Sequence, residues 1–193
     1  MTKPILVLLA ALPLAACFSF GAKPPPTLMT LTSASAVPVG TAQSSASSPS
    51  ILILVPSVPQ ALATARVPVQ ASDTSVAYLK DAQWVEPPQR LFARLLADTV
   101  TSRGRIVLSA EQSFSDPSAR LTGELRNFGA DAATSAAVVT FDAALIRTAG
   151  TAVEKRRFEA RVPLAAITPA EVAVALNTAA NQVAGEVADW VGR

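Results

Sequence analysis

The sequence predicts an α+β domain in which a mixed, mainly antiparallel sheet carries two main helices packed on it. Three segments between residues 120 and 162 alternate apolar and polar side chains with a period of two, and short turns separate them. Residues 88–103 and 169–190 instead repeat apolar side chains with the helical period. Because consecutive strands joined by short turns pair antiparallel, the helices have one broad sheet to cover.

The first sixteen residues have the pattern of a secretory signal. The cation Lys3 precedes an apolar run at residues 5–12 that is too short to span the hydrocarbon of a bilayer. Two alanines then come directly before Cys17, the only cysteine of the chain. This ending resembles a bacterial lipoprotein signal, in which the chain is cut before the cysteine and the thiol carries an acyl chain such as palmitate. We therefore expect a signal peptide at residues 1–16 and lipidation at Cys17; the alternative is an ordinary signal or membrane anchor that contains a cysteine.

The composition argues against an enzyme and gives no indication of nucleic-acid binding. The formal net charge is +2, and because Lys3 leaves with the signal, 15 basic residues face 14 acidic ones in the mature chain. The chain has no histidine, and its cysteine is assigned to lipid, which removes imidazole bases, thiol nucleophiles, disulfides and the usual zinc ligand sets. The remaining carboxylates, lysines and serines are not spaced in a catalytic pattern. We expect no catalytic residue, no metal, no cofactor and no nucleic acid partner.

The mature chain is predicted to be one domain behind a tether. Residues 17–26 contain three consecutive prolines, which favour an extended spacer between the lipid and the domain. Residues 27–193 are enough for a single globular domain with its own core. Within it, residues 27–32 are rich in strand formers and are expected to form a first edge strand. Residues 33–50 have no aromatic or charged side chain, which predicts a flexible segment, with an O-glycosylated or partner-docking segment as the alternative.

The next segments predict a central strand and a hairpin. Residues 51–55 are apolar without alternation, as in a strand covered on both faces, and two prolines end the run. Residues 60–65 are expected to form a turn of helix. Residues 66–69 and 76–79 then predict two short strands on either side of a polar turn.

A helix follows Trp84, and two prolines mark its start. Pro87 and Pro88 suit the first helical turn, while Arg103 and Gly104 supply a cation and a left-handed cap at its end. One face of the helix is apolar and is formed by Leu91, Phe92, Leu95, Leu96 and Val100.

Past this helix the period drops to two, which predicts a strand at residues 106–111 and then the three long strands of a meander. A bulge near residues 127–129 of the first long strand is expected to aim Phe128 inward. The second long strand is expected to bury Ala137, Val139, Phe141, Ala143 and Leu145, with Thr140 and Asp142 on the opposite face. A hairpin turn at residues 149 and 150 leads into the third, at residues 153–162.

The last predicted element is a helix with a capping box. The Thr168 hydroxyl is expected to accept a hydrogen bond from a free amide, Pro169 takes the first helical position, and Glu171 reaches back to the amide of Thr168. Its apolar stripe is expected to lie on the sheet and consists of Val172, Leu176, Ala179, Val183, Val187 and Trp190.

These elements together resemble the auxiliary lipoprotein component of ABC-type transporters, a family that includes the small lipoprotein partner of the paraquat-inducible MCE system. The resemblance covers most of the chain from about residue 27. Residues 33–50 depart from the family pattern by their length. The residues that carry the resemblance are Tyr78, Trp84, Pro87, Pro88, Leu95, Leu96, Leu121, Leu125, Phe128, Leu145, Phe158, Ala175, Leu176 and Trp190.

The resemblance implies a non-enzymatic subunit that works with an ABC permease and a lipid-binding MCE protein to move phospholipid or other apolar molecules between membranes. The protein would be lipid-anchored in the cell envelope and would face the periplasm, with homo-oligomerisation left open. Phe18 stands where inner-membrane lipoproteins of enteric-type bacteria carry aspartate, which favours the outer membrane. The alternatives are a direct periplasmic lipid carrier and an outer-membrane assembly or structural lipoprotein unrelated to ABC transport.

Three side chains are candidates for contact with a partner or with lipid. Lys155 and Arg157 belong to a basic run that could meet acidic headgroups or an acidic partner surface, although a solvated hairpin edge that discourages aggregation is the favoured explanation. Trp84 could line a lipid groove or anchor an interface, whereas the alternative places it in the core between the sheet and the helix. Trp190 has the same two interpretations, and its place in the helical stripe favours the core.

Overall fold

The computed structural model describes residues 27–109, 112, 117–148, 150 and 152–192. The predicted signal peptide, Cys17 and the tether lie outside the described residues, as do Ala110, Glu111 and Ala149 of the predicted strand and turn. The strands are β1 (Ser50–Ile53), β2 (Arg66–Ser72), β3 (Ser75–Gln83), β4 (Ile106–Leu108), β5 (Ala119–Asp131), β6 (Ala136–Arg147) and β7 (Val153–Pro163). The helices are the 3-10 turn η1 (Gln60–Leu62), α1 (Pro88–Ser102) and α2 (Pro169–Val191).

Strands β5, β6 and β7 form the predicted antiparallel meander. Phe141 of β6 pairs with Phe158 of β7, and a register shift between Leu125 and Asn127 of β5 provides the predicted bulge. Phe128 is buried, as that bulge requires. Thr140 lies on the predicted face, opposite the buried set, but the sequence did not predict its burial: it is only 2% exposed. Hydrogen bonds from Asn127 and to Glu159 cover its hydroxyl on the sheet face away from the helices.

The other edge of β5 is shared by two strands. β1 runs parallel to the start of β5, where Ile51 pairs with Ala119, and β2 runs parallel to its end, where Val69 pairs with Ala130. β4 lies parallel on the outside of β1, and β3 closes the hairpin with β2. The sheet therefore has seven strands of mixed direction among the described residues, and β1 is the central strand that its unbroken apolar sequence predicts.

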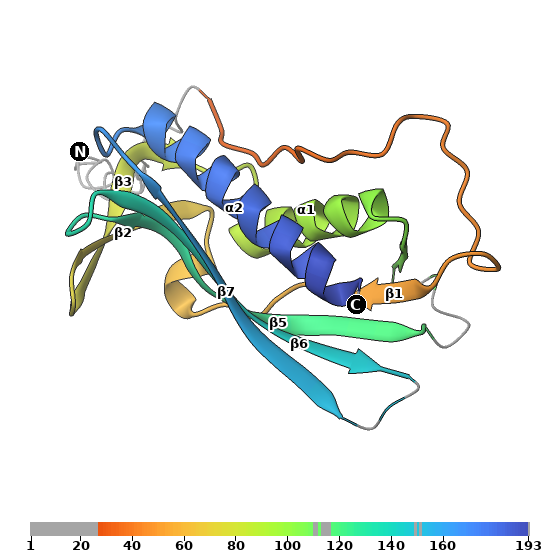
Figure 1. The fold of residues 1–193 in the computed structure, drawn as a ribbon. Coiled ribbons are helices and arrows are strands. Elements are labelled where there is room, and N and C mark those ends of the chain that lie inside the picture. Colours follow the sequence, from red (N-terminus) through yellow and green to blue (C-terminus); the bar gives the residue numbers. More distant parts are fainter. Residues whose placement is uncertain (1–26, 110–111, 113–116, 149, 151, 193) are drawn as a thin grey trace, which may run out of the picture.

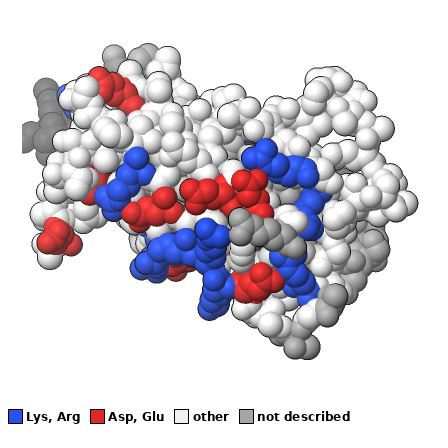
Figure 2. All heavy atoms as spheres, viewed as in Figure 1, with Lys and Arg blue, Asp and Glu red and all other residues white. Residues whose placement is uncertain are grey.

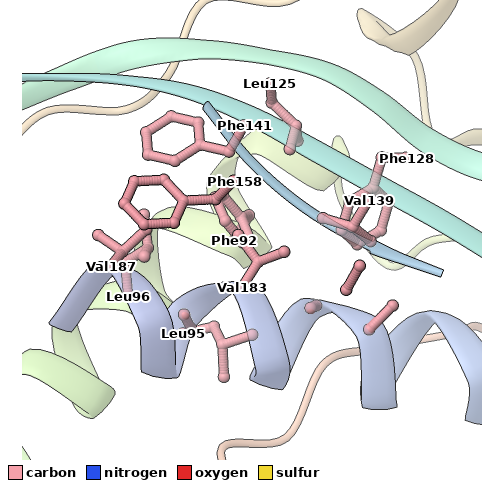
Figure 3. Packing of buried hydrophobic residues seen from close by; sticks show 14 of the residues in the cluster. Phe92, Leu95, Leu96, Leu125, Phe128, Val139, Phe141, Phe158, Val183 and Val187 are labelled. Carbon is pink, nitrogen blue, oxygen red and sulfur yellow. The ribbon is translucent and has the colours of Figure 1, made fainter. Parts of the chain in front are cut away.

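Both long helices cover one face of the sheet (Figure 1). Helix α1 begins at Pro88 and buries the predicted apolar face, and Gly104 after it has φ of 84°, the left-handed conformation expected at a helix end. In Figure 3, side chains of β5–β7 point toward those of the helices, and the rings of Phe92 and Phe141 meet edge to face with centroids 5.3 Å apart. The α+β class with two helices on one sheet is thus confirmed.

The start of α2 differs from prediction in one hydrogen bond. Thr168 accepts from the amide of Glu171 at 3.4 Å, as a cap should. The Glu171 carboxylate, however, accepts from the amide of Ala166 at 3.0 Å, not from Thr168. The loop before the helix folds back over its first turn, so Glu171 meets an amide two residues earlier than the capping box predicts.

The edge strand predicted at residues 27–32 is reduced to one bridge. Met29 pairs in parallel with Trp84, and the following residues run along the helices to β1 without forming a strand (Figure 1). Strand β4 is also shorter than predicted within the described chain. No helix among the described residues is both long enough and apolar enough to cross a membrane.

Candidate functional site

The face of the sheet that points away from the helices carries a network of charged side chains. Glu124, Asp142 and Arg157 stand in register across β5, β6 and β7. Arg157 donates two hydrogen bonds to the Asp142 carboxylate, at 2.6 and 2.7 Å, and Arg126 lies 3.6 Å from the same carboxylate. The hydrogen bonds from Arg157 hold the pKa of Asp142 below its usual value of 3.8, against the opposing effect of desolvation.

A second ion-pair cluster lies nearer the other end of the meander. Arg161 donates to Glu159 at 2.8 Å and lies 3.4 Å from Asp131. The bond from Arg161 lowers the pKa of Glu159, and hydrogen bonds from Thr134 lower the pKa of Asp131. In Figure 2, basic and acidic side chains accordingly lie side by side over the sheet side of the molecule. These carboxylates are held ionised, so the face presents fixed charges of both signs.

Lys155 lies beside this network without a partner of its own. Among the described residues, no carboxylate lies within salt-bridge distance of its ammonium group. It borders a surface hollow of about 680 Å³ whose floor is formed by small residues of β5 and β6. Ser57, Thr122, Arg156 and Arg157 also line it, together with the acidic residues Glu124 and Asp142. The structure therefore brings Lys155 and Arg157 to one hollow, where Lys155 is the freer cation.

Arg156 departs from the alternation of its neighbours. Its guanidinium lies 4.8 Å from the centroid of the Phe158 ring, on the side of the sheet that faces the helices. Because β7 pairs with β6 alone among the described strands, it is an edge strand, and Arg156 reaches the rim of the hollow from that edge. The basic residues 155–157 thus point to both faces of the sheet at its open edge, as in a solvated hairpin.

Trp84 lies in the core. Its side chain is 1% exposed, and its ring centroid lies 5.3 Å from that of Phe128. The indole Nε1 has no hydrogen-bond partner among the described residues. Trp84 therefore offers no surface to a partner in this structure. Trp190 is half-buried and packs on Phe158 with centroids 5.6 Å apart.

The residues that sequence reasoning missed are Asn177 and Asn181 of α2. Both bind the backbone of the extended segment before β1, through bonds of 2.8 to 2.9 Å. The available signal was two asparagines four residues apart on one face of a predicted helix, next to its apolar stripe. Within the described ranges, no three His, Cys, Asp or Glu side chains gather closely enough to hold a metal ion.

Solved structures share the fold at low sequence identity. The crystal structure of protein XCC0632 from Xanthomonas campestris, of the DUF330 family, has 21% identity and a TM-score of 0.70, covering 86% of this chain and 94% of that one. The crystal structure of an uncharacterized protein has 19% identity and a TM-score of 0.65, covering 74% of this chain and 92% of that one. No curated protein matches the chain.

The sequence itself matches one family model over residues 30–188, which is most of the chain. That model describes the ABC-type transport auxiliary lipoprotein component. The match begins at the segment that crosses α2 and ends in the last turn of the same helix, so it contains every strand of the described residues, α1 and all but the last three residues of α2. A lipoprotein family indicates association with the cell envelope. This chain belongs to the ABC-type transport auxiliary lipoprotein component family.

Proposed function

We propose that this protein is a non-enzymatic adaptor subunit of an MCE-type ABC transport system for phospholipid or other apolar molecules. It is anchored through acyl chains on Cys17, faces the periplasm, and is attached to the outer membrane. Its partners are an MCE-family protein and the ABC permease complex. The observation that carries an adaptor role over a carrier role is the filled space between the sheet and the helices.

That space is where a carrier of this architecture would hold a lipid. Instead it is occupied by fully buried rings and aliphatic side chains, including Phe92, Phe141 and Phe158. Interiors packed in this way leave no room for a further acyl chain. The hollows lie elsewhere. One of about 680 Å³ lies on the polar sheet face, one of about 490 Å³ lies between η1, β2 and the end of β5, and one of about 410 Å³ lies in a groove between β7 and the start of α2. To bury an acyl chain between the sheet and the helices, the protein would therefore have to open its core.

The anchor gives the adaptor its position. Each methylene that an acyl chain buries in a membrane contributes about 0.8 kcal/mol, and two or more chains hold a protein stably at the surface. The domain then works by where it is held and by what its surface contacts. Lys155, beside the hollow of the charged face, is the cation best placed to meet an acidic partner surface.

The anchor is tested by replacing Cys17 with serine in the full chain. The variant should leave the membrane fraction and lose function in transport, because its folded domain carries no other membrane attachment in this proposal. Fractionation of the envelope and a transport assay measure the two effects. A Cys17→Ser protein that stays membrane-bound and transports normally contradicts the proposal.

The adaptor role is tested by purifying the full chain and analysing it by mass spectrometry. An adaptor should contain no stoichiometric phospholipid and should capture an MCE-family protein. Lys155→Glu should weaken that capture, whereas Lys80→Glu, an exposed lysine on β3, should not. Reproducible stoichiometric lipid would instead establish a carrier, and the absence of permease, ATPase and MCE genes next to its own would favour a structural lipoprotein.

A further inference from the structure

Two asparagine side chains fasten the segment before β1 to the outside of helix α2. The Thr32 amide donates to Asn177 Oδ1 at 2.9 Å, Asn181 Nδ2 donates to the Thr32 carbonyl at 2.9 Å, and the Ala34 amide donates to Asn181 Oδ1 at 2.8 Å. Figure 1 shows this segment crossing the helices on the side opposite the sheet. We refer to residues 29–34 as the strap.

The spacing of a helix and that of an extended chain coincide at this contact. Alternate residues of an extended chain direct their N–H and C=O groups to the same edge, about 6.6 Å apart. Residues four apart on a helix advance about 6 Å along its axis and share one face. Asn177 and Asn181 therefore stand opposite Thr32 and Ala34. Each amide side chain supplies the donor or acceptor that a neighbouring strand would supply.

Further contacts hold the strap in register. Asn181 Nδ2 also donates to the Asn177 carbonyl at 2.8 Å, which fixes the orientation of the Asn181 amide. At the other end of the strap, the Met29 amide donates to the Gln83 carbonyl at 2.8 Å, and the Val85 amide donates to the Met29 carbonyl at 2.9 Å. The side chains of Met29 and Leu31 pack against the core. The strap is thus bound through its backbone and through alternate side chains.

The chain after Ala34 is bound very differently. The hydrogen bonds of residues 35–48 join residues no more than four apart, in turns at Pro38 and Ser44. The next attachment to the rest of the domain is the Pro49 carbonyl, which accepts from the Ile106 amide at 3.1 Å. About fourteen residues without hydrogen bonds to the rest of the domain therefore separate the strap from the first strand.

We propose that helix α2 is a docking surface for the strap and that this contact sets the length of the tether between the membrane and the domain. The inference rests on the lipidation of Cys17 in the proposed function. With the strap docked, twelve residues separate Cys17 from Met29 and span at most about 40 Å. With the strap released, 33 residues separate Cys17 from Ser50 and span at most about 110 Å.

The contact is suited to release. All three hydrogen bonds between the strap and the asparagines are exposed to water, so water replaces them when the strap leaves. Segments held by exposed hydrogen bonds open at lower free energy than the core. The domain keeps its sheet when the strap opens, because β1 is held separately between β4 and β5. A partner at a distance from the membrane is therefore reached without unfolding the domain.

The docking is tested by amide hydrogen exchange on the full chain. The Asn177→Ala, Asn181→Ala double variant should speed exchange at Thr32 and Ala34 by about tenfold or more, since it removes all three bonds. Asn181→Asp should have a smaller effect, because its carboxylate still accepts from Ala34 but no longer donates to Thr32. Asn127→Ala, which alters the only other asparagine, on the sheet, is the matched control and should leave both amides unchanged. Unchanged exchange in the double variant overturns the docking.

The reach is tested by energy transfer from a dye at the C-terminus of the lipidated protein to a dye in phospholipid vesicles. Because backbone hydrogen bonds also hold Met29, the variant used here adds Met29→Pro, which removes the amide that donates to Gln83, to the two asparagine substitutions. This triple variant should transfer less efficiently than the wild type, and Asn127→Ala should match the wild type. Equal energy transfer in all three proteins would show that the strap does not set the tether length, even if amide exchange at Thr32 and Ala34 is faster. If the wild-type protein does not insert into the vesicles, the anchor fails and the reach fails with it, while the exchange result still decides the docking.

Discussion

At the scale of single residues, Gly123 on β5 has no room for a side chain. A Cβ placed there would lie 2.2 Å from the Asp142 carbonyl oxygen and 2.7 Å from the nearest atom of the Phe141 ring. Since the backbone of β6 cannot move without breaking its pairing, we expect Gly123→Ala to lower the free energy of unfolding by about 1–3 kcal/mol or more. Urea unfolding followed by circular dichroism measures the change.

Gly185 provides the matched control on helix α2. A Cβ there would meet nothing within 4 Å, and the residue lies in the interior of the helix. Gly185→Ala should therefore raise stability by about 0.5–1 kcal/mol. Equal effects of the two substitutions would contradict the packing described for Gly123.

Asp142 gives the charged face a pH dependence. Its pKa in the folded protein is depressed, first by the hydrogen bonds from Arg157, so the ionised carboxylate stabilises the fold above its unfolded pKa, and this contribution is lost as pH falls through the lower folded pKa. We expect Asp142→Asn to be less stable than the wild type at pH 7, and the two to converge below about pH 4. Denaturant unfolding at a series of pH values measures the difference.

Asp73, in the turn between β2 and β3, supplies the control for that experiment. It forms no ion pair with a described residue. Asp73→Asn should therefore follow the wild type at every pH. A gap between wild type and Asp142→Asn that is constant with pH would mean that the carboxyl group acts through its shape and not through its charge.

Single residues were predictable where one local rule decides their environment. The burial of Phe128 followed from alternation and a bulge. The burial of Thr140 could not be predicted in this way, because it depends on Asn127 and Glu159 from the two neighbouring strands. Asn177 and Asn181 could be placed on a helix face, but their partner is a segment 145 to 149 residues away, which no local pattern identifies.

At the scale of elements, the start of α2 depends on its cap. The Thr168 hydroxyl accepts from the Glu171 amide, and Pro169 at the first helical position needs no acceptor. We expect Thr168→Ala to lower the free energy of unfolding by about 1 kcal/mol, and Thr168→Ser, which keeps the hydroxyl, to cost much less. Thermal unfolding of both variants measures the effect, and an equal loss in the serine variant would assign it to the lost methyl group.

Helices and strands whose own sequence has a clear period or cap were predicted, whereas those whose formation depends on a neighbouring strand were not. Both long helices have a proline at the start and an apolar stripe, and the meander strands alternate over their whole length. Residues 27–32 have strand-forming side chains, but only Met29 finds a pairing partner. Strand formation there is decided by the edge that the sheet leaves open, which composition does not reveal.

At the scale of the whole molecule, we expect substitutions in the central strand β1 to lower the free energy of unfolding strongly. Ile51 is fully buried in this central strand. We expect Ile51→Ala to lower the free energy of unfolding by about 2–5 kcal/mol, while Leu54→Ala, just past the strand and 38% exposed, should cost less than about 1 kcal/mol. Fluorescence of Trp84 and Trp190 and far-UV circular dichroism should report one shared transition, since both tryptophans contact the same core. Separate transitions would contradict a single cooperative core.

The class of the fold was predictable because its repeating patterns add up, whereas the sheet order was not. The sharing of one edge of β5 by β1 and β2 joins residues 51 and 69 to residues 119 and 130. Nothing local specifies which strand takes which half of that edge. The charged face follows from the same order, because it brings Lys155 and Arg157 beside Ser57 at one hollow.

The place of β1 between β4 and β5 also fixes when this chain can fold. Both neighbours of β1 lie more than fifty residues later, at Ile106–Leu108 and Ala119–Asp131. A chain threaded across a membrane from its N-terminus delivers the apolar residues 50–55 well before anything can pair with them. If the protein is exported as the proposed function requires, we expect it to cross the membrane unfolded and to need a holding chaperone until β5 has emerged. The late arrival of β5 would keep such an exported chain unfolded during crossing, while the apolar residues of β1 stay exposed until it arrives.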